Sequence, residues 1–235
     1  MLANHAGILM RNLTFDEAYF AHLRRTLSQG TIDTVYMVGF SSLFALSIGL
    51  LLGIMLYLTA PGCLYASPKF NRILGIIINI GRSIPFVIIV IAVFPLARFI
   101  VGTSIGRTAA IVPLTIAAIP FTARIVEVAL NELGRGIIEA AIAAGATPLQ
   151  IVLRVLLPES ASSIVLGFTL TIINLISLSA MAGIIGGGGL GDIALRYGHQ
   201  RFRTDILILT VIILIILVQI IQFVGQFLAR RLDKR

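Results

Sequence analysis

Long apolar runs, separated by short polar or glycine- and proline-rich stretches, fill most of this sequence. A helix needs about 20 mainly apolar residues to cross the hydrocarbon core of a bilayer, and five runs reach that length. The expected spans cover residues 32–58, 73–100, 108–130, 163–185 and 205–228. The pattern predicts an all-α integral membrane protein with about five transmembrane helices.

Glycine and proline mark the breaks in this pattern. Residues 60–62 (Ala-Pro-Gly) end the first expected span, and four glycines at 186–189 end the fourth. The second span is interrupted at residues 82–85 and again at Pro95, although its apolar character continues. We expect a single interrupted span in this region.

The first thirty residues are more polar than the spans. Residues 13–29 predict a short helix, because Thr14 and Glu17 have the spacing of a capping box, in which the two side chains satisfy free backbone N–H groups. This helix is too polar to cross a bilayer. We expect residues 1–30 to form an extracytoplasmic or interfacial segment, and residues 31–235 to form a single transmembrane domain.

The composition agrees with a membrane protein. Hydrophobic residues make up 58% and charged residues 12% of the 235 residues, whereas soluble domains carry about 25% charged residues. The formal net charge of +8 would suggest nucleic acid as a partner of a soluble protein. Here the basic residues lie in loops and in the C-terminal tail, so the expected partner is membrane lipid and not nucleic acid.

Residues 131–160 form a polar segment between the third and fourth spans. Its first part predicts a helix that begins near Gly136, with Glu139 in the first turn, where the helix dipole favours a carboxylate. Gly145 follows at the position where glycine commonly ends a helix in the left-handed conformation. The alanines between them would allow a partner to approach closely.

A second helix follows in the same segment. Thr147 and Gln150 have the spacing of a capping box, with Pro148 at the favoured first helical position. Pro158 is expected to end this helix at Leu157. The segment is therefore predicted to be helix, tight turn, helix. It is either a docking surface for a soluble partner or a loop that only joins two spans.

The sequence contains no motif for binding ATP. A phosphate-binding loop requires Gly-x-x-x-x-Gly-Lys-Ser/Thr, and the only lysines, Lys69 and Lys234, do not follow a glycine. Gly186, Gly188 and Gly191 fit Gly-x-Gly-x-x-Gly, but they end a span, whereas a dinucleotide site follows a strand. We therefore expect no ATPase activity and no cofactor in this chain.

Catalytic and metal chemistry also lack a recognisable pattern. His5, His22 and His199 are scattered without metal-ligand spacing, and the single Cys63 cannot form an internal disulfide. The spans hold no paired carboxylates and no His/Cys cluster. We expect no catalytic residue and no metal site. A membrane-embedded enzyme or an assembly factor is the alternative to a transport protein.

Polar residues inside the second span are candidates for a translocation path. A cation within a span is a functional-site hypothesis by default, so Arg82, with Ser83 and Pro85 after it, is expected to line such a path. The alternative is that Arg82 lies near the cytoplasmic end of a long helix and reaches the headgroups, while Pro85 is a structural kink.

The fourth span carries polar or flexible residues at helical spacing, on one face of the helix. They are Gly167, Thr171, Asn174, Ser177 and Met181. This stripe lines the path, with Met181 from two subunits forming a flexible apolar constriction, or it hydrogen-bonds to a neighbouring helix.

The polar segment resembles the EAA motif of the permease subunits of ABC importers. The matching residues are Glu139, Ala140, Ala141, Gly145, Leu157 and Pro158. The resemblance implies a type I importer fold with five core helices. It also implies a cytoplasmic coupling helix that docks on a separate ATP-hydrolysing subunit, which binds the ATP and Mg.

Further segments resemble the permeases of methionine importers over most of residues 31–228. They cover residues 82–86, 101–106, 110–115 and 188–191. The resemblance implies a homodimer with two ATPase subunits, an extracytoplasmic substrate-binding lipoprotein, and import of methionine, L- and D-, by alternating access. A phosphonate, an osmolyte or a methionine derivative is the alternative cargo.

The expected topology depends mainly on the polar segment. If residues 131–160 face the cytoplasm, five spans place the N-terminus outside and the C-terminus inside the bacterial cytoplasmic membrane. The basic C-terminal tail agrees with the positive-inside rule. The basic residues of the other loops divide almost equally between the two sides, so they add little.

Overall fold

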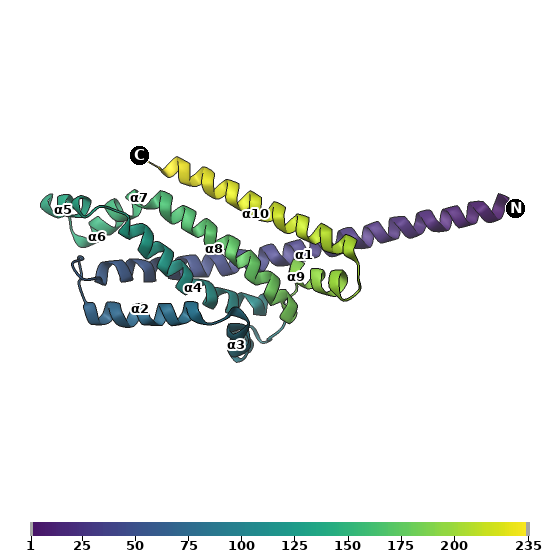
Figure 1. The fold of residues 1–235 in the computed structure, drawn as a ribbon, viewed down its shortest axis with the longest axis horizontal. Helices are drawn as coiled ribbons and strands as arrows, with labels where there is room; N and C mark the ends of the chain where they lie inside the picture. Colours follow the sequence, from purple (N-terminus) through teal and green to yellow (C-terminus); the bar gives the residue numbers. More distant parts are fainter. Residues whose placement is uncertain (1, 234–235) are drawn as a thin grey trace.

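The computed structural model describes the backbone of residues 2–233. It describes the side chains of residues 17, 19–134 and 136–233. Its described elements are helices joined by short turns (Figure 1). The longer helices are α1 (Leu2–Thr59), α2 (Pro68–Ser83), α3 (Phe86–Val101), α4 (Arg107–Asn131), α8 (Ala161–Ala182) and α10 (Thr204–Leu232). The short elements, three of them π-helical turns marked η, are α5 (Arg135–Ala143), α6 (Pro148–Gln150), η1 (Ile151–Leu156), α7 (Leu157–Glu159), η2 (Gly183–Gly187), α9 (Gly189–Ile193) and η3 (Ala194–His199).

Four helical segments in the described chain are long and apolar enough to cross a membrane. They are Tyr19–Thr59 of α1, α4, α8 with η2, and α10. The pair α2 and α3 makes a fifth span if it is counted as one, although the two helices are bent by 106°. The predicted all-α membrane fold and the number of spans are confirmed.

The bend between α2 and α3 is sharper than the sequence indicated. Pro85 has no backbone N–H to continue a helix, and its ring disfavours the helical conformation at the preceding residue. Ile84 accordingly has φ −81° and ψ 125°, in the extended region. Pro95, by contrast, stays inside α3, so the second predicted interruption is wrong.

The N-terminal helix is continuous, and the predicted short helix over residues 13–29 is wrong. The Thr31 hydroxyl donates to the Leu27 carbonyl oxygen at 2.8 Å, which is compatible with an uninterrupted helix. Gly30 lies in close contact with another element, since a Cβ there would be 2.2 Å from Cδ1 of Ile193. The expected boundary at residue 30 therefore falls inside α1, while the location of residues 1–30 outside the bilayer stays a prediction.

Helix α4 occupies the centre of the bundle and packs against α1, α2, α3 and α8. Two glycines one turn apart bring α1 close to it. A Cβ at Gly49 would lie 2.5 Å from Cβ of Thr122, and one at Gly53 would lie 2.6 Å from Cβ of Val126. Small residues at this spacing allow membrane helices to approach closely.

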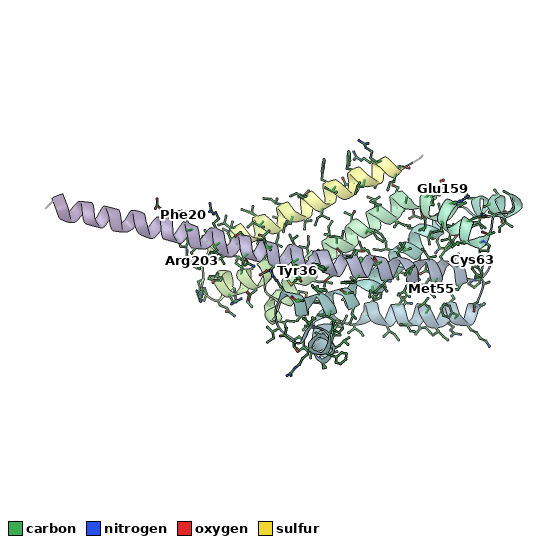
Figure 2. All side chains as sticks on the ribbon, turned by 180° about the vertical axis from the view of Figure 1, so that it is seen from behind. Phe20, Tyr36, Met55, Cys63, Glu159 and Arg203 are labelled. Carbon is green, nitrogen blue, oxygen red and sulfur yellow. The ribbon has the colours of Figure 1, made fainter. Side chains whose placement is uncertain are left out.

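The short elements gather at opposite ends of the bundle (Figure 1). We call residues 131–160 the foot; they follow the end of α4 and contain α5, α6, η1 and α7. The opposite or far end contains η2, α9, η3 and the start of α10, packed on the part of α1 near Tyr19 and Leu27. Figure 2 shows Cys63 and Glu159 at the foot end, and Phe20 and Arg203 at the far end.

Candidate functional site

The turn at the centre of the foot is fixed by backbone hydrogen bonds. Gly145 has φ +75°, in the left-handed region that favours glycine. Its N–H donates to the Ile142 oxygen at 2.9 Å, and the Ala146 N–H donates to the Ala141 oxygen at 3.1 Å. This pair of bonds is the Schellman arrangement, which satisfies carbonyls at a helix end. The prediction for Gly145 is confirmed.

The capping box after this turn is also confirmed. The Thr147 N–H donates to Oε1 of Gln150 at 2.9 Å, and the Gln150 N–H donates to the Thr147 hydroxyl at 3.4 Å. Two details of the local prediction are wrong. Helix α5 begins at Arg135, which moves Glu139 out of the first turn. Pro158 lies inside α7 and does not stop the helix.

A wide helical turn explains how the chain passes Pro158. The Leu157 N–H donates to the Val152 oxygen, five residues back, in the π-helical turn η1. Pro158 itself has no N–H to donate, and the Ser160 N–H donates to the Leu156 oxygen at 3.0 Å. The shifted bonding lets the helix continue to Glu159.

Buried apolar side chains attach the foot to the bundle. Ile151, Val152 and Leu156 are buried in one cluster with Tyr57 of α1 and Leu130 of α4. Burial of a large aliphatic side chain is worth about 1.5–3 kcal/mol. This cluster, which we call the attachment cluster, therefore joins the foot to the ends of α1 and α4.

The six residues of the predicted coupling motif divide into two groups. Glu139, Ala140 and Gly145 are exposed on the foot. Ala141 and Leu157 are partly buried against the attachment cluster, and Pro158 is also partly buried. The first group is available to a partner, and the second group holds the foot in place.

The foot also exposes large apolar side chains that the sequence interpretation missed. They are Ile137, Ile142, Leu149 and Leu153, of which Leu149 is 67% exposed. Clustered exposed apolar residues commonly mark an interaction site. For Ile137 a signal was present, because the adjacent Ile137 and Ile138 cannot both face the bundle from one helix.

A cavity of about 560 Å³ lies between α5 and the connection from α1 to α2. Its lining includes Glu139 and Ile142 on the foot, with Pro61 and Cys63 on the connection. The foot is therefore separated from this connection by open space on one side, while the attachment cluster holds the other side.

Arg82 lies about midway along the bundle. A Cβ at the adjacent Gly81 would be 2.9 Å from Cγ of Pro120, which is in the middle of α4. Helix α2 begins at the foot end with Pro68, and 14 residues of helix span about 21 Å. Arg82 therefore lies in the last turn of α2 and about midway along the bundle; its place in a path and the alternative that it reaches the headgroups both stay predictions. Pro85 nonetheless forms the expected kink.

A groove of about 400 Å³ runs from Arg82 towards the foot between α2, α4 and α8. Its walls include Phe121 and Leu170, and Glu132 and Ser163 line it near the foot. The Ser163 hydroxyl donates to Oε2 of Glu132 at 2.9 Å. Arg82 itself forms no hydrogen bond or ion pair with the described part of the chain. Ser83 does not line this groove, and its hydroxyl donates to the Asn79 oxygen of its own helix.

The predicted stripe on α8 divides in two. Gly167 packs closely on α4, where a Cβ would lie 2.1 Å from Cγ2 of Ile125, and Thr171 is fully buried. Asn174 is partly buried, while Ser177 and Met181 are exposed. Ser177 and Met181 are therefore exposed in the half of the stripe towards the far end, while Gly167 in the other half also lines the groove beside Arg82.

The sequence profile of a transport family matches residues 18–235. The family is described as the inner membrane component of binding-protein-dependent transport systems. The chain belongs to this family. It is accordingly a transport permease of the inner membrane, and not an ATPase.

Two relatives match this permease over nearly their whole length. A probable D-methionine transport system permease protein of Vibrio cholerae is 49% identical over 217 residues, which cover 92% of this chain and 96% of that protein. The methionine import system permease protein of Bacillus subtilis is 41% identical over 220 residues, covering 93% and 99%. The resemblance to methionine-transport permeases is confirmed.

A solved structure gives the same fold. The inward-facing methionine ABC transporter MetNI contains a chain that is 46% identical, with a TM-score of 0.87 over 89% of this permease and 97% of that chain. The expected type I permease fold of an ABC importer is confirmed.

One of the segments that carried the resemblance, residues 101–106, meets the glycine run at 186–189 at the far end of this permease. The Gly106 N–H donates to the Gly186 oxygen at 2.9 Å, joining the connection before α4 to η2. The sequence interpretation did not place these glycines together, because residues 80 positions apart give no local signal of contact.

Proposed function

We propose that this permease imports methionine, in its L- and D-forms, across the bacterial cytoplasmic membrane. This proposal rests on the sequence similarity, over nearly the full length of the chain, to two permeases named for methionine transport. Transport proceeds by alternating access, in which the bundle opens first to one side of the membrane and then to the other.

The foot is the proposed contact with a partner ATPase, which binds ATP and Mg and hydrolyses the nucleotide. The exposed motif residues Glu139, Ala140 and Gly145 and the neighbouring exposed Leu149 support this role. Ala141, Leu157 and Pro158 hold the foot against the bundle. Closure of the ATPases then moves the foot, and the attachment cluster transmits that movement to α1 and α4.

Two copies of the permease are proposed to form a homodimer with one ATPase on each foot. The position of Arg82 supports this arrangement, because a charged side chain midway through a membrane protein faces water or protein and not lipid. The groove beside Arg82 would then open into a path between the copies. The proposed path and gate residues are Arg82, Ser83, Pro85, Asn174, Ser177 and Met181.

The foot is proposed to face the cytoplasm, which places the far end and the N-terminus outside and the C-terminus inside. A substrate-binding lipoprotein would deliver methionine at the far end. The exposed Arg230 and Arg231 near the end of α10, on the cytoplasmic side in this orientation, agree with the positive-inside rule.

Reconstitution tests the cargo directly. The permease, its ATPase and its binding protein are placed in proteoliposomes, and uptake of labelled L- and D-methionine is measured with hydrolysable and non-hydrolysable ATP. Uptake of both enantiomers should require hydrolysis. Uptake of a phosphonate or an osmolyte, with none of methionine, would show that the cargo is wrong while the permease role stands.

The proposed gate has a separate test. Met181 is 40% exposed at the far half of α8, and Met181→Ala removes most of the side chain that would close the path. The substitution should raise ATP hydrolysis without a matching rise in uptake. If the variant keeps the wild-type ratio of ATP hydrolysis to methionine uptake, Met181 is not part of the gate.

A further inference from the structure

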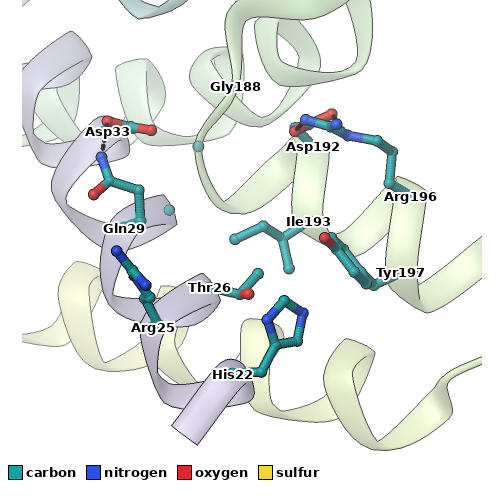
Figure 3. Close-up of a pocket in the computed structure, with 12 residues that line it drawn as sticks. His22, Arg25, Thr26, Gln29, Asp33, Gly188, Asp192, Ile193, Arg196 and Tyr197 are labelled. Atoms are coloured by element: carbon teal, nitrogen blue, oxygen red, sulfur yellow. Dashed lines mark hydrogen bonds and ion pairs between the residues drawn. The ribbon is translucent and has the colours of Figure 1, made fainter. Parts of the chain in front are cut away.

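A polar cavity of about 480 Å³ opens at the far end, between α1 and the segment formed by α9 and η3 (Figure 3). One wall is a single face of α1, with side chains at helical spacing. The α1 wall includes His22, Arg25, Gln29 and Asp33. The facing wall includes Asp192, Arg196 and Tyr197. Ile193 lies between the two walls in Figure 3.

Both acidic side chains of this cavity already have cationic partners. Asp33 accepts hydrogen bonds from Nη1 of Arg107 at 2.7 Å and from Nε2 of Gln29 at 3.0 Å. Asp192 accepts a hydrogen bond from Nε of Arg196 at 2.6 Å, and a second from the same guanidinium. Each carboxylate is therefore already paired with an arginine, and neither is left unpaired for a cationic ligand.

Arg25 is the unmatched charge. Its guanidinium lines the cavity and forms no ion pair or hydrogen bond with the described part of the chain. The His22 ring lies on the same wall, edge-on to Tyr197 with centroids 6.4 Å apart. A free guanidinium beside polar donors favours a carboxylate, with which it forms charge-assisted hydrogen bonds.

We propose that this cavity receives an acidic side chain of the extracytoplasmic binding protein, which pairs with Arg25 when that protein docks. The inference rests on the proposed orientation and partner. Further exposed arginines lie on or next to the elements that line the cavity, namely Arg24 on α1 and Arg201, whose guanidinium lies over the Tyr197 ring. They make the far end attractive to an acidic partner, and the cavity fixes the position of one carboxylate.

The occupant is a protein side chain and not the free amino acid. A free amino acid carries an ammonium group as well as a carboxylate, and the cavity has no unengaged acidic group to receive it. The cavity is also open to solvent, whereas small-molecule sites bury most of their ligand. An acidic side chain of a docked protein can bind here with only the Arg25 guanidinium as its partner and an open entrance to the cavity.

The adjacent arginine supplies a matched control. Arg24 is exposed on the same helix but does not line the cavity. The assembled complex is reconstituted with each variant, and ATP hydrolysis is measured against the concentration of binding protein. Arg25→Glu should raise the half-maximal concentration by about tenfold or more, while Arg24→Glu, with the same change in net charge, should raise it less than about threefold. Basal hydrolysis should be unchanged in both.

The outcomes separate the inference from the proposed function. If the half-maximal concentration of binding protein shifts equally in the two variants, or does not shift in Arg25→Glu, the cavity is not the docking position. Stimulation of the wild type by methionine alone, lost in Arg25→Glu, would also overturn it by identifying a small-molecule occupant. Failure of the binding protein to stimulate even the wild type would instead contradict the proposed function.

A charge exchange identifies the partner residue. Each exposed Asp or Glu on the docking face of the binding protein is changed to Lys and tested against the Arg25→Glu permease. One such variant should recover at least half of the lost affinity for Arg25→Glu, and not for Arg24→Glu. A complete set of variants without recovery would contradict the proposed pairing.

Discussion

The foot and the far end both make sharp turns at glycine, but different contacts surround the two turns. A Cβ at Gly145 on the foot would meet no atom within 4 Å, so packing imposes no requirement for glycine there. At the far end, Gly189 has φ +80°, and a Cβ there would lie 2.7 Å from Oγ1 of Thr34. The foot therefore presents a defined shape with little packed against it, while the far end is closely packed internally.

Side-chain chemistry differs in the same way. The foot exposes Leu149 and Leu153, which suits an apolar contact with a partner. The far end is bridged by ion pairs, Asp33 to Arg107 and Asp192 to Arg196, although it also exposes Ile105 and Phe202. Under the proposed function, we expect a lasting attachment at the foot and a transient one at the far end.

The largest expected effect on stability comes from the packed end. Gly191→Ala places a methyl group against the backbone of α8, which must move, at a cost of about 3 kcal/mol. Thermal unfolding in detergent should show a clear loss of stability. Gly39→Ala on α1, where a Cβ meets no atom within 4 Å, is the control and should not lower the unfolding temperature, because alanine is favoured over glycine inside a helix.

The apolar surface of the foot should dominate binding of the ATPase. Leu149→Asp loses the burial of one leucine, about 1.5–3 kcal/mol, or roughly 10- to 100-fold in affinity for each foot. Co-purification of the ATPase measures the change. Ile105 at the far end is also 67% exposed, and Ile105→Asp should leave this affinity unchanged. Equal losses of ATPase affinity in the two variants would show that the foot and the far end do not differ in binding the ATPase.

The turn of the foot requires glycine at residue 145 for its backbone conformation and not for packing. Gly145→Ala keeps the open surroundings but places a Cβ in the left-handed region, at a cost of about 1–2 kcal/mol. Coupled hydrolysis should fall several-fold while the complex still assembles. Gly136→Ala, in helical conformation on the same foot, should have no such effect.

The ion pairs of the far end should contribute least to stability. Arg107 is 45% exposed where it meets Asp33, so solvent screens the pair. Arg107→Gln should lower the free energy of unfolding by about 0–1 kcal/mol, with a smaller effect at high salt. A loss above this range, measured by chemical denaturation, would show that this end depends on its charges for folding.

Local signals in the sequence predicted the features that depend on neighbouring residues. Apolar run lengths gave the spans, and the turn at Gly145 and the Thr147–Gln150 capping box followed from short-range backbone chemistry. Residues before a proline avoid the helical conformation, so a break near Pro85 was predictable, although its angle of 106° was not.

Features set by contacts between distant residues were not predicted. α1 continues through residue 30, where its face packs on Ile193 and Ile206, far along the chain. The close approach of Gly49 and Gly53 to α4 had a signal in their four-residue spacing, which the sequence interpretation overlooked. The exposed Leu149 had no clear signal, because an apolar residue in an amphipathic helix is ordinarily expected to be buried.

Crosslinking tests the central claim most directly, that the foot is the contact with the ATPase inside the cell. The single Cys63 is replaced by Cys63→Ser, and Glu139→Cys and Ile105→Cys are introduced separately. A short bifunctional thiol reagent should join Glu139→Cys to the ATPase subunit and leave Ile105→Cys unjoined. The absence of an adduct at Glu139→Cys, or its labelling from outside intact cells by an impermeant reagent, would contradict the account.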